Sequence, residues 1–221
     1  MTNEEILSHV DHTLLKATAT WEDIKSLCDD ELTYKTASVC VPQTHVKKIN
    51  EHFNSKVNIC TVVGFPLGYN STESKVAETV QALADGANEI DMVINIAAVK
   101  NNDYSLVEHE INEIKKACGD HILKVIIETC YLTEEEKIEM CKVISNTKAN
   151  YIKTSTGFGT GGATFADIKL FKKYIRPTLL IKAAGGIKSI EDLNKFLELG
   201  CDRLGTSRAI NIIKGQESKG Y

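Results

Sequence analysis

Ala87-Asn88-Glu89-Ile90-Asp91 is the first of three segments that align with one another without gaps. The other two are Ala149-Asn150-Tyr151-Ile152-Lys153 and Cys201-Asp202-Arg203-Leu204-Gly205, and a looser copy, Thr36-Ala37-Ser38-Val39-Cys40, precedes them. Each of the three follows a helix-like stretch and begins a strand-like one. Four further strand-like runs lie before and between the copies, at residues 10–15, 57–65, 123–129 and 179–184. The chain therefore has eight candidate strands.

Helix start signals follow most of these runs. They have the form S/T-x-x-D/E, in which a hydroxyl caps the first turn and an acidic side chain three residues later returns the hydrogen bond. Such signals begin at Thr20, Thr133, Thr164 and Ser189, and Gly200 is a stop signal after the last of them. Apolar residues at helical spacing follow each start.

Eight strand-then-helix units without a Gly/Ser/Pro-rich linker predict one α/β domain. We expect a single-domain (β/α)8 TIM barrel over residues 1–213. A doubly wound open sheet is the alternative. Residues 214–221 are polar and contain two glycines, and they are expected to form a flexible C-terminal tail.

Composition excludes several classes of protein. The 221 residues are 43% hydrophobic and 25% charged, with a net charge of -4 and a pI near 5.9, which argues against a nucleic-acid-binding surface. The N-terminal segment lacks the basic start and apolar stretch of a signal peptide, and no apolar run is long enough to span a membrane. We therefore expect a cytoplasmic protein. The seven cysteines show no C-x-x-C spacing and the six histidines no H-E-x-x-H, so we expect buried reduced thiols and no metal.

The repeat also predicts a layer of side chains. It aligns Cys40, Asp91, Lys153 and Gly205 on the second, fourth, sixth and eighth strands. Alternate strands of a TIM barrel contribute to a common layer, and catalysis takes place at the carboxyl ends of the strands. Lys182, on the seventh strand, directs a second lysine into the same volume. A reactive centre is expected there.

Two neighbouring lysines favour chemistry at an amine. Repulsion between the two ammonium groups, together with burial, is expected to lower the pKa of one of them, and a neutral lysine forms Schiff bases with carbonyl compounds. Asp91 could move protons directly or through water. The alternative is that Lys153 and Asp91 form a purely structural ion pair. Two lysines facing a single inward acid would leave one positive charge without compensation, which argues against that alternative. Lys124 and Glu128, on the fifth strand, are expected to neutralise one another and to act as support.

A phosphate site is expected beside this centre. Glycines and hydroxyl residues follow strands six, seven and eight, and the loops after strands seven and eight are the habitual phosphate site of this fold. Lys188 and Arg208 could add positive charge. Taken singly, each glycine is best explained by a tight turn, and it is their clustering on consecutive loops that indicates an anion site. The candidate residues are Gly157, Gly185, Gly186, Lys188, Gly205, Thr206 and Ser207.

At these residues the sequence resembles the deoxyribose-phosphate aldolases, a family of class I aldolases. The resemblance extends from the Asp11-His12-Thr13-Leu14-Leu15-Lys16 motif to about Ile213. Its most specific motifs are Ile152-Lys153-Thr154-Ser155-Thr156-Gly157-Phe158, Lys182-Ala183-Ala184-Gly185-Gly186-Ile187, Glu89-Ile90-Asp91-Met92-Val93-Ile94-Asn95 and Thr61-Val62-Val63-Gly64-Phe65-Pro66.

The resemblance implies an enzyme that reversibly cleaves 2-deoxy-D-ribose 5-phosphate into D-glyceraldehyde 3-phosphate and acetaldehyde. It implies that Lys153 forms the Schiff base, that Lys182 perturbs it and takes part in proton transfer, and that Asp91 is the acid/base. It also implies no metal or organic cofactor, a role in deoxynucleoside breakdown, and commonly a homodimer. Asp11, Cys40 and Lys124 are expected to support the site.

The sequence departs from the family pattern at three positions. Lys188 stands where arginine is usual, Arg208 where a small residue is common, and Ala17 where proline is usual. Two alternative functions stay open, namely a Schiff-base aldolase or transaldolase-like enzyme acting on another phosphorylated sugar, and a barrel that binds a sugar phosphate without chemistry. Tyr221 ends the tail and could reach the barrel mouth to close the site or move a proton.

Overall fold

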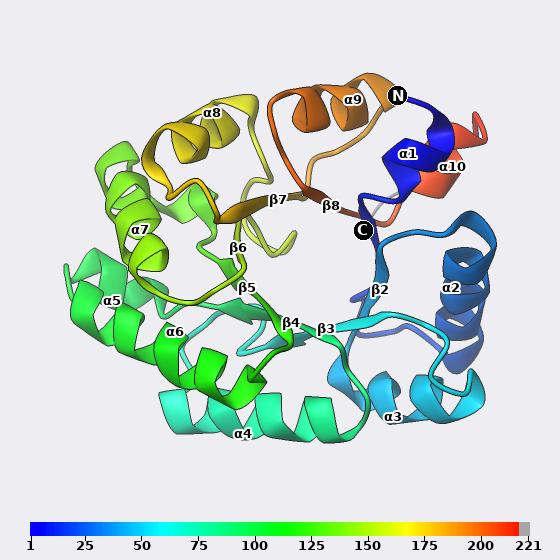
Figure 1. The fold of residues 1–221 in the computed structure, drawn as a ribbon, viewed down its shortest axis with the longest axis horizontal. Coiled ribbons are helices and arrows are strands. Elements are labelled where there is room, and N and C mark those ends of the chain that lie inside the picture. The colour runs from blue at the N-terminus through cyan, green and yellow to red at the C-terminus, as the bar shows by residue number, and fades with distance from the viewer. Residues whose placement is uncertain (217–221) are drawn as a thin grey trace.

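The computed structural model describes residues 1–216, and its sheet is a closed barrel. All neighbouring strands are parallel, and β1 pairs with β8 to complete the ring. The (β/α)8 prediction is confirmed, and the closed ring excludes the open sheet (Figure 1). The strands are β1 (Val10–Thr13), β2 (Ser38–Val41), β3 (Ile59–Val63), β4 (Glu89–Val93), β5 (Ile122–Ile126), β6 (Tyr151–Lys153), β7 (Leu180–Ala184) and β8 (Arg203–Thr206).

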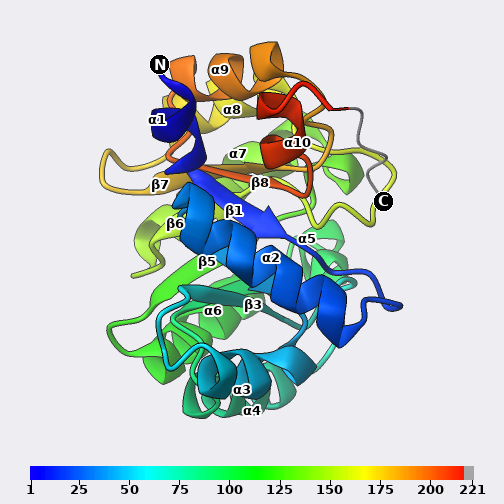
Figure 2. The ribbon, with the colours of Figure 1, turned by 90° about the vertical axis from the view of Figure 1, so that its right-hand side faces the viewer.

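Helices surround the barrel on its outside, as Figures 1 and 2 show. Within the described residues they are α1 (Asn3–Leu7), α2 (Trp21–Tyr34), α3 (Gln43–His52), α4 (Thr72–Ala84), α5 (Ile96–Lys100), α6 (Tyr104–Cys118), α7 (Glu134–Asn146), α8 (Phe165–Tyr174), α9 (Ile190–Glu198) and α10 (Ala209–Ile213), with a 3-10 turn, η1, at Thr129–Tyr131. The short helices α1 and α5 and the turn η1 were not expected from the sequence.

The expected helix starts are present. Thr20, Thr133 and Ser189 each form a capping box with the acidic residue three positions later, and Thr164 accepts a hydrogen bond from the Asp167 backbone N–H. Gly200 follows α9 with a φ of +94°, a conformation that suits glycine. Local capping chemistry therefore sets where these helices begin and end.

The main apolar core lies between the strands and the helices. It contains the outward-facing residues of the strands, such as Ile90 and Met92 of β4 and Ile181 of β7. The strand residues that face the helices thus form this core, and the residues of opposite parity face the barrel interior.

The seven cysteines are free thiols, and six of them are buried.

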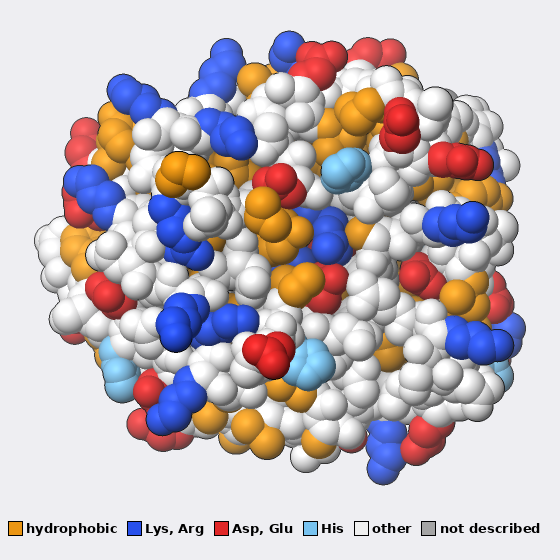
Figure 3. Space-filling view, in the orientation of Figure 1, with side chains coloured by type: hydrophobic (Ala, Val, Ile, Leu, Met, Phe, Trp, Pro, Cys, Tyr) orange, Lys and Arg blue, Asp and Glu red, His pale blue; other side chains and the backbone are white. Residues whose placement is uncertain are grey.

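The residues that face the barrel interior form layers, which the strand registers define. The deep layer consists of Ser38, Glu89, Tyr151 and Arg203. The middle layer consists of Asp11, Cys60, Lys124 and Lys182. The upper layer consists of Cys40, Asp91, Lys153 and Gly205, the four positions that the repeat aligns. The interior is rich in charge, and Figure 3 shows basic side chains at the centre of the end of the barrel that faces the viewer.

The first residues after α10 stay close to the barrel. The Gln216 N–H donates to the Asn211 carbonyl, and the Lys214 ammonium lies 4.6 Å from the centre of the Tyr34 ring. Tyr221 lies outside the described residues, so its place relative to the mouth stays a prediction, as does the division of the chain at residue 213.

Candidate active site

Lys153 ends the short strand β6 and extends into an open cavity. Its ammonium donates to Asp91 Oδ2 at 2.7 Å, and its side chain is 4% exposed. The cavity has a volume of about 210 Å³, and Lys153 lies on its wall beside residues of the loops that follow β6, β7 and β8. Lys153 is therefore the interior lysine that meets a space large enough for a small substrate.

Lys182 lies one layer deeper. It is the register partner of Lys153 on the neighbouring strand, but its side chain is fully buried. Its ammonium donates to the same Asp91 oxygen at 2.7 Å and also contacts Asp11 closely. Burial lowers the pKa of Lys182, but the two carboxylates outweigh burial and hold its pKa above the ordinary range. The expected lowering of a lysine pKa therefore does not fall on Lys182.

The interior holds more acids than the sequence indicated. Asp91 is joined by Asp11 and Glu89, so the expectation of a single inward acid is wrong. Lys124 contacts all three carboxylates, at 2.9 Å from Asp91, 2.5 Å from Glu89 and 3.6 Å from Asp11. Arg203 closes the network from the deep layer by pairing with Asp11 and Glu89.

Cations still exceed anions in this network. It joins four basic side chains, Lys124, Lys153, Lys182 and Arg203, to three acidic ones, Asp11, Glu89 and Asp91. Burial raises the pKa of Asp91, but the attraction of its three lysines is stronger and holds the pKa well below its usual range. Asp91 is therefore a carboxylate that binds ammonium protons. The network therefore carries one positive charge in excess.

Glu128 does not pair with Lys124, contrary to expectation. The chain leaves β5 after Ile126, and Glu128 has a φ of +51°, so strand parity no longer governs its direction. Its carboxylate instead accepts hydrogen bonds from the Thr156 N–H at 3.1 Å and from the Thr156 hydroxyl. Burial raises the pKa of Glu128. It thus fixes the start of the loop after β6.

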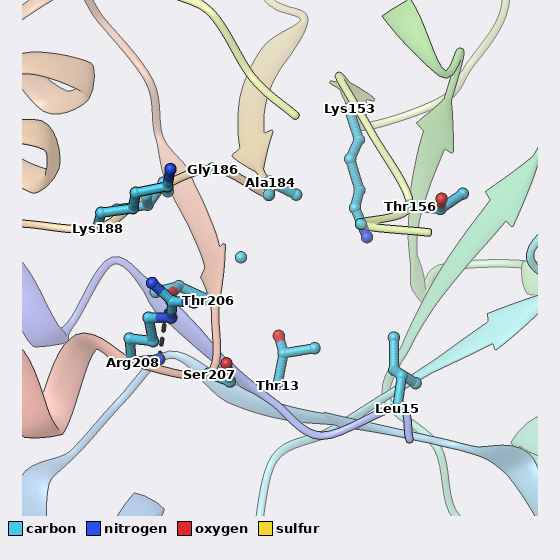
Figure 4. A pocket seen from close by; sticks show the side chains of 14 residues that line it. Thr13, Leu15, Lys153, Thr156, Ala184, Gly186, Lys188, Thr206, Ser207 and Arg208 are labelled. Carbon is cyan, nitrogen blue, oxygen red and sulfur yellow. Dashed lines mark hydrogen bonds between the residues drawn. The ribbon is translucent and has the colours of Figure 1, made fainter. Parts of the chain in front are cut away.

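The opposite side of the cavity carries the expected phosphate-binding residues. Figure 4 shows Lys153 extending into the cavity from one side, while Lys188, Thr206 and Arg208 lie on the other. The Arg208 N–H donates to the Thr206 hydroxyl at 3.0 Å, which shapes the turn after β8. The candidates that line the cavity are Gly157, Gly185, Gly186, Lys188, Gly205, Thr206, Ser207 and Arg208.

Two of these glycines allow close packing. Gly185 and Gly186 have φ values of +74° and +78°, which a residue with a side chain adopts only under strain. Gly205 has a different reason, because a Cβ atom on it would lie 3.1 Å from the Lys182 Cε atom. Glycine at this position of the upper layer makes room for the lysine beneath it.

Several residues of the site were missed. Thr13, Leu15 and Thr156 line the cavity, and Glu89 and Arg203 complete the charge network. A signal for the last two exists, since they occupy the third position of the aligned repeats, two residues before Asp91 and Gly205. Side chains two apart in a strand face the same way, so the repeat that predicts the upper layer also predicts the deep layer.

Two buried clusters bring together ligand types that metals use. The Sγ atoms of Cys40 and Cys60 and a carboxylate oxygen of Asp91 lie within 4.8 Å of one another, and Asp11, Cys60 and Glu89 form a second such group. The carboxylates in both groups already contact Lys124, which competes with a metal cation for them. Their chemistry suits ammonium groups better than a divalent ion.

Comparison with known proteins assigns the family. The family model for the DeoC/LacD family aldolases matches residues 6–207. Over 221 residues, all of both chains, the sequence is 65% identical to the deoxyribose-phosphate aldolase of Clostridium botulinum (strain Alaska E43 / Type E3). It is 55% identical to that of Clostridioides difficile (strain 630), over 99% of this chain and all of the relative. A tetrameric deoxyribose phosphate aldolase from Aeropyrum pernix has a similar structure, with a TM-score of 0.90 and 28% identity over 97% of this chain and 92% of that chain.

Proposed function

Because this chain belongs to the DeoC/LacD family of aldolases, we propose that it cleaves 2-deoxy-D-ribose 5-phosphate reversibly into D-glyceraldehyde 3-phosphate and acetaldehyde, with Lys153 as the Schiff-base lysine. The observation that carries the assignment is the position of Lys153. Of the three lysines in the charge network, it is the one on the wall of the cavity, and it faces the phosphate side across that cavity.

The reaction starts at the amine. Neutral Lys153 attacks the aldehyde carbon of the open-chain sugar, and loss of water gives a protonated imine. Asp91 is 2.7 Å from the amine and accepts the proton that Lys153 must lose. Lys182 is bound to the same Asp91 oxygen, so its positive charge lies close to the amine during the reaction.

Cleavage follows from the imine. The bond between C2 and C3 breaks, its electron pair moves towards the imine nitrogen, and the C3 hydroxyl loses its proton as glyceraldehyde 3-phosphate forms. The enamine left on Lys153 takes up a proton at carbon, and hydrolysis releases acetaldehyde. Asp91 and Lys182 are the titratable side chains in the cluster that contains the Lys153 amine.

The phosphate is assigned to the loops after β6, β7 and β8. Lys188 and Arg208 supply charge on that side of the cavity, and the backbone at Gly185 and Gly186 has no side chains that would bar close approach. Binding the phosphate there leaves the sugar chain to extend across the cavity to Lys153. This arrangement makes the phosphate a positioning handle for the aldehyde.

We also expect a homodimer that works in the cytoplasm without a metal or organic cofactor. Among residues 1–216, no helix combines the length and apolar character needed to cross a lipid bilayer. The Aeropyrum pernix relative is described as a tetramer, so the assembly of this chain is a matter for direct measurement. Light scattering during size-exclusion chromatography would determine it.

Borohydride trapping tests the proposed function. Incubation with acetaldehyde and borohydride should attach an ethyl group permanently to Lys153, and peptide mapping should locate it. Lys153→Ala should abolish both trapping and cleavage, whereas Lys182→Ala should fold and react slowly. Modification at Lys182 would show that the two roles are inverted.

The same experiment separates the alternatives. A barrel that only binds sugar phosphates would show no trapped adduct. A Schiff-base aldolase for another sugar, including a transaldolase-like enzyme, would be trapped but would cleave 2-deoxyribose 5-phosphate poorly in a substrate survey.

A further inference from the structure

Two thiols lie side by side in the barrel interior. Cys40 of β2 and Cys60 of β3 are register partners on neighbouring parallel strands, and both are fully buried. Both belong to one small inward cluster, separate from the main apolar core. Their Sγ atoms lie within 4.8 Å of one another and of an Asp91 carboxylate oxygen. Neighbouring strands are about 4.8 Å apart, inside the range of Cα separations that a disulfide bridges.

One of these thiols takes part in the charge network. The Cys60 S–H donates to Asp91 Oδ1 at 3.2 Å, and the Lys124 ammonium donates to Cys60 Sγ at 3.3 Å. The polar contact with the Cys60 side chain lowers the pKa of the Cys40 thiol, and Lys182 and Lys153 act in the same direction against the opposing effects of burial and Asp91. Cys40 is therefore the thiol of the pair that more readily becomes a nucleophile.

The pair lies just beneath the surface of the mouth. Leu15, Val62 and Phe65 pack over the two thiols and also line a hollow at the barrel mouth. The same apolar side chains therefore contact both the thiol cluster and that hollow. The other buried thiols, such as Cys118 and Cys141, belong to the core between the sheet and the helices.

We propose that Cys40 and Cys60 form a reversible disulfide under hydroperoxide stress, and that this bond slows the enzyme. The Cys40 thiolate attacks the peroxide oxygen, which gives a sulfenic acid and releases the other oxygen as hydroxide or alkoxide. The Cys60 sulfur then attacks the Cys40 sulfur, the S–S bond forms, and the sulfenic oxygen leaves as water with the thiol proton. The two thiols are oxidised by two electrons and the peroxide is reduced by two.

The bond would alter the environment of Asp91. A disulfide has no S–H, so Asp91 Oδ1 loses the donor that Cys60 now provides. Cys60 must also turn away from Asp91 and Lys124 towards Cys40. The aspartate that accepts the proton of Lys153 is then held differently, while the lysine itself is unmodified. We expect turnover to fall by about tenfold, the scale of one hydrogen bond to a charged group.

The experiment follows thiols and activity in parallel. The reduced full-length protein is treated with hydrogen peroxide, alkylated, and digested with trypsin without reduction. Cys40 and Cys60 fall in separate tryptic peptides, residues 36–47 and 57–75, so a disulfide appears as one crosslinked species. Two of the seven thiols should be lost, activity should fall by about tenfold, and dithiothreitol should restore both. Cys60→Ala should show neither crosslink nor reversible loss relative to its own untreated activity, while Cys141→Ala should behave like wild type.

Several results would overturn the proposal. A sulfinic acid on Cys40 with no crosslink, a crosslink between other cysteines, or a Cys40–Cys60 bond that leaves turnover unchanged would each do so. The activity readout rests on the proposed function, whereas the peptide map does not. If the reduced protein fails to cleave the sugar phosphate, the proposed function fails and the crosslink is still tested by the map.

Discussion

Because cations exceed anions in the barrel interior, loss of a carboxylate from the network should destabilise the protein more than loss of a lysine. Asp91→Asn leaves four cations facing two carboxylates, and Lys153 loses its carboxylate partner. Lys182→Met leaves three cations facing three carboxylates. Asp91 then keeps Lys124 and Lys153, and Asp11 keeps Lys124 and Arg203.

These contacts set the expected magnitudes. Removing one partner of a buried ion pair costs about 3–5 kcal/mol when it leaves a charge without compensation, which describes Asp91→Asn. Lys182→Met leaves no carboxylate unpaired and replaces the lysine by an apolar chain of similar length. It should therefore lower the free energy of unfolding by about 1–2 kcal/mol, so the two variants should differ by about 1–4 kcal/mol.

Urea denaturation at pH 7.5 and fixed protein concentration measures both values, since oligomers unfold in a concentration-dependent way. Lys142→Met, on the exposed surface of α7, is the matched control and should leave the unfolding free energy unchanged. If Lys182→Met destabilises the protein as much as Asp91→Asn, the reasoning from excess positive charge is refuted.

Four other predictions follow from particular residues. Lys188→Met and Arg208→Met should each weaken the phosphorylated substrate by about 1–3 kcal/mol and leave turnover of free 2-deoxyribose unchanged; equal losses on both substrates would assign these residues to folding. Excess acetaldehyde should inactivate wild type faster than Cys40→Ala, because an unsaturated aldehyde formed by dehydration of an aldol product alkylates the thiol; equal rates would clear Cys40. Tyr221→Phe should slow solvent deuterium exchange into acetaldehyde without changing borohydride trapping, whereas unchanged exchange would leave Tyr221 without a role. Burial raises the pKa of Glu31 to about 7, so between its unfolded pKa and 7 the folded state binds more protons than the unfolded state, and stability falls as pH rises. Glu31→Gln should therefore raise the free energy of unfolding by about 2–3 kcal/mol at pH 8 and by almost nothing at pH 4.5. An equal increase at both pH values in denaturant titrations would contradict this reasoning.

The barrel and its upper layer could be predicted because both are repetitive. One strand-and-helix unit recurs, and strand alternation converts the alignment of Asp91 with Lys153 into a shared direction. Cap signals at Thr20 and Ser189 are local, so the sequence alone places the starts of those helices. Where structure depends on a period or on adjacent residues, sequence is a sufficient guide.

Two features of the site depend on how the barrel closes and on where a strand ends. The repeating pattern of the sequence predicts neither of these. The raised pKa of Lys182 requires Asp11, which comes from the other end of the chain and approaches only when β1 pairs with β8. Glu128 was assigned to β5 by extrapolation, but the strand stops at Ile126 and the backbone turns into a left-handed conformation. Tertiary packing decides where a strand ends, so parity arguments fail beyond that residue.

The separation of the main apolar core from the barrel interior bears on how this scaffold accepts change. Hydrophobic burial that holds the fold together is concentrated in the shell between strands and helices. Within the described residues, the inner volume holds a small apolar group around Cys40 and Cys60, together with the ionic network of Asp91, Lys124 and Lys182. Substitutions at the mouth, for example at Leu15 or Thr13, leave that outer shell intact. The residues that determine catalysis and the residues that stabilise the fold therefore lie on opposite faces of the same eight strands. New substrate preferences could be selected inside the barrel with little loss of stability from the apolar core.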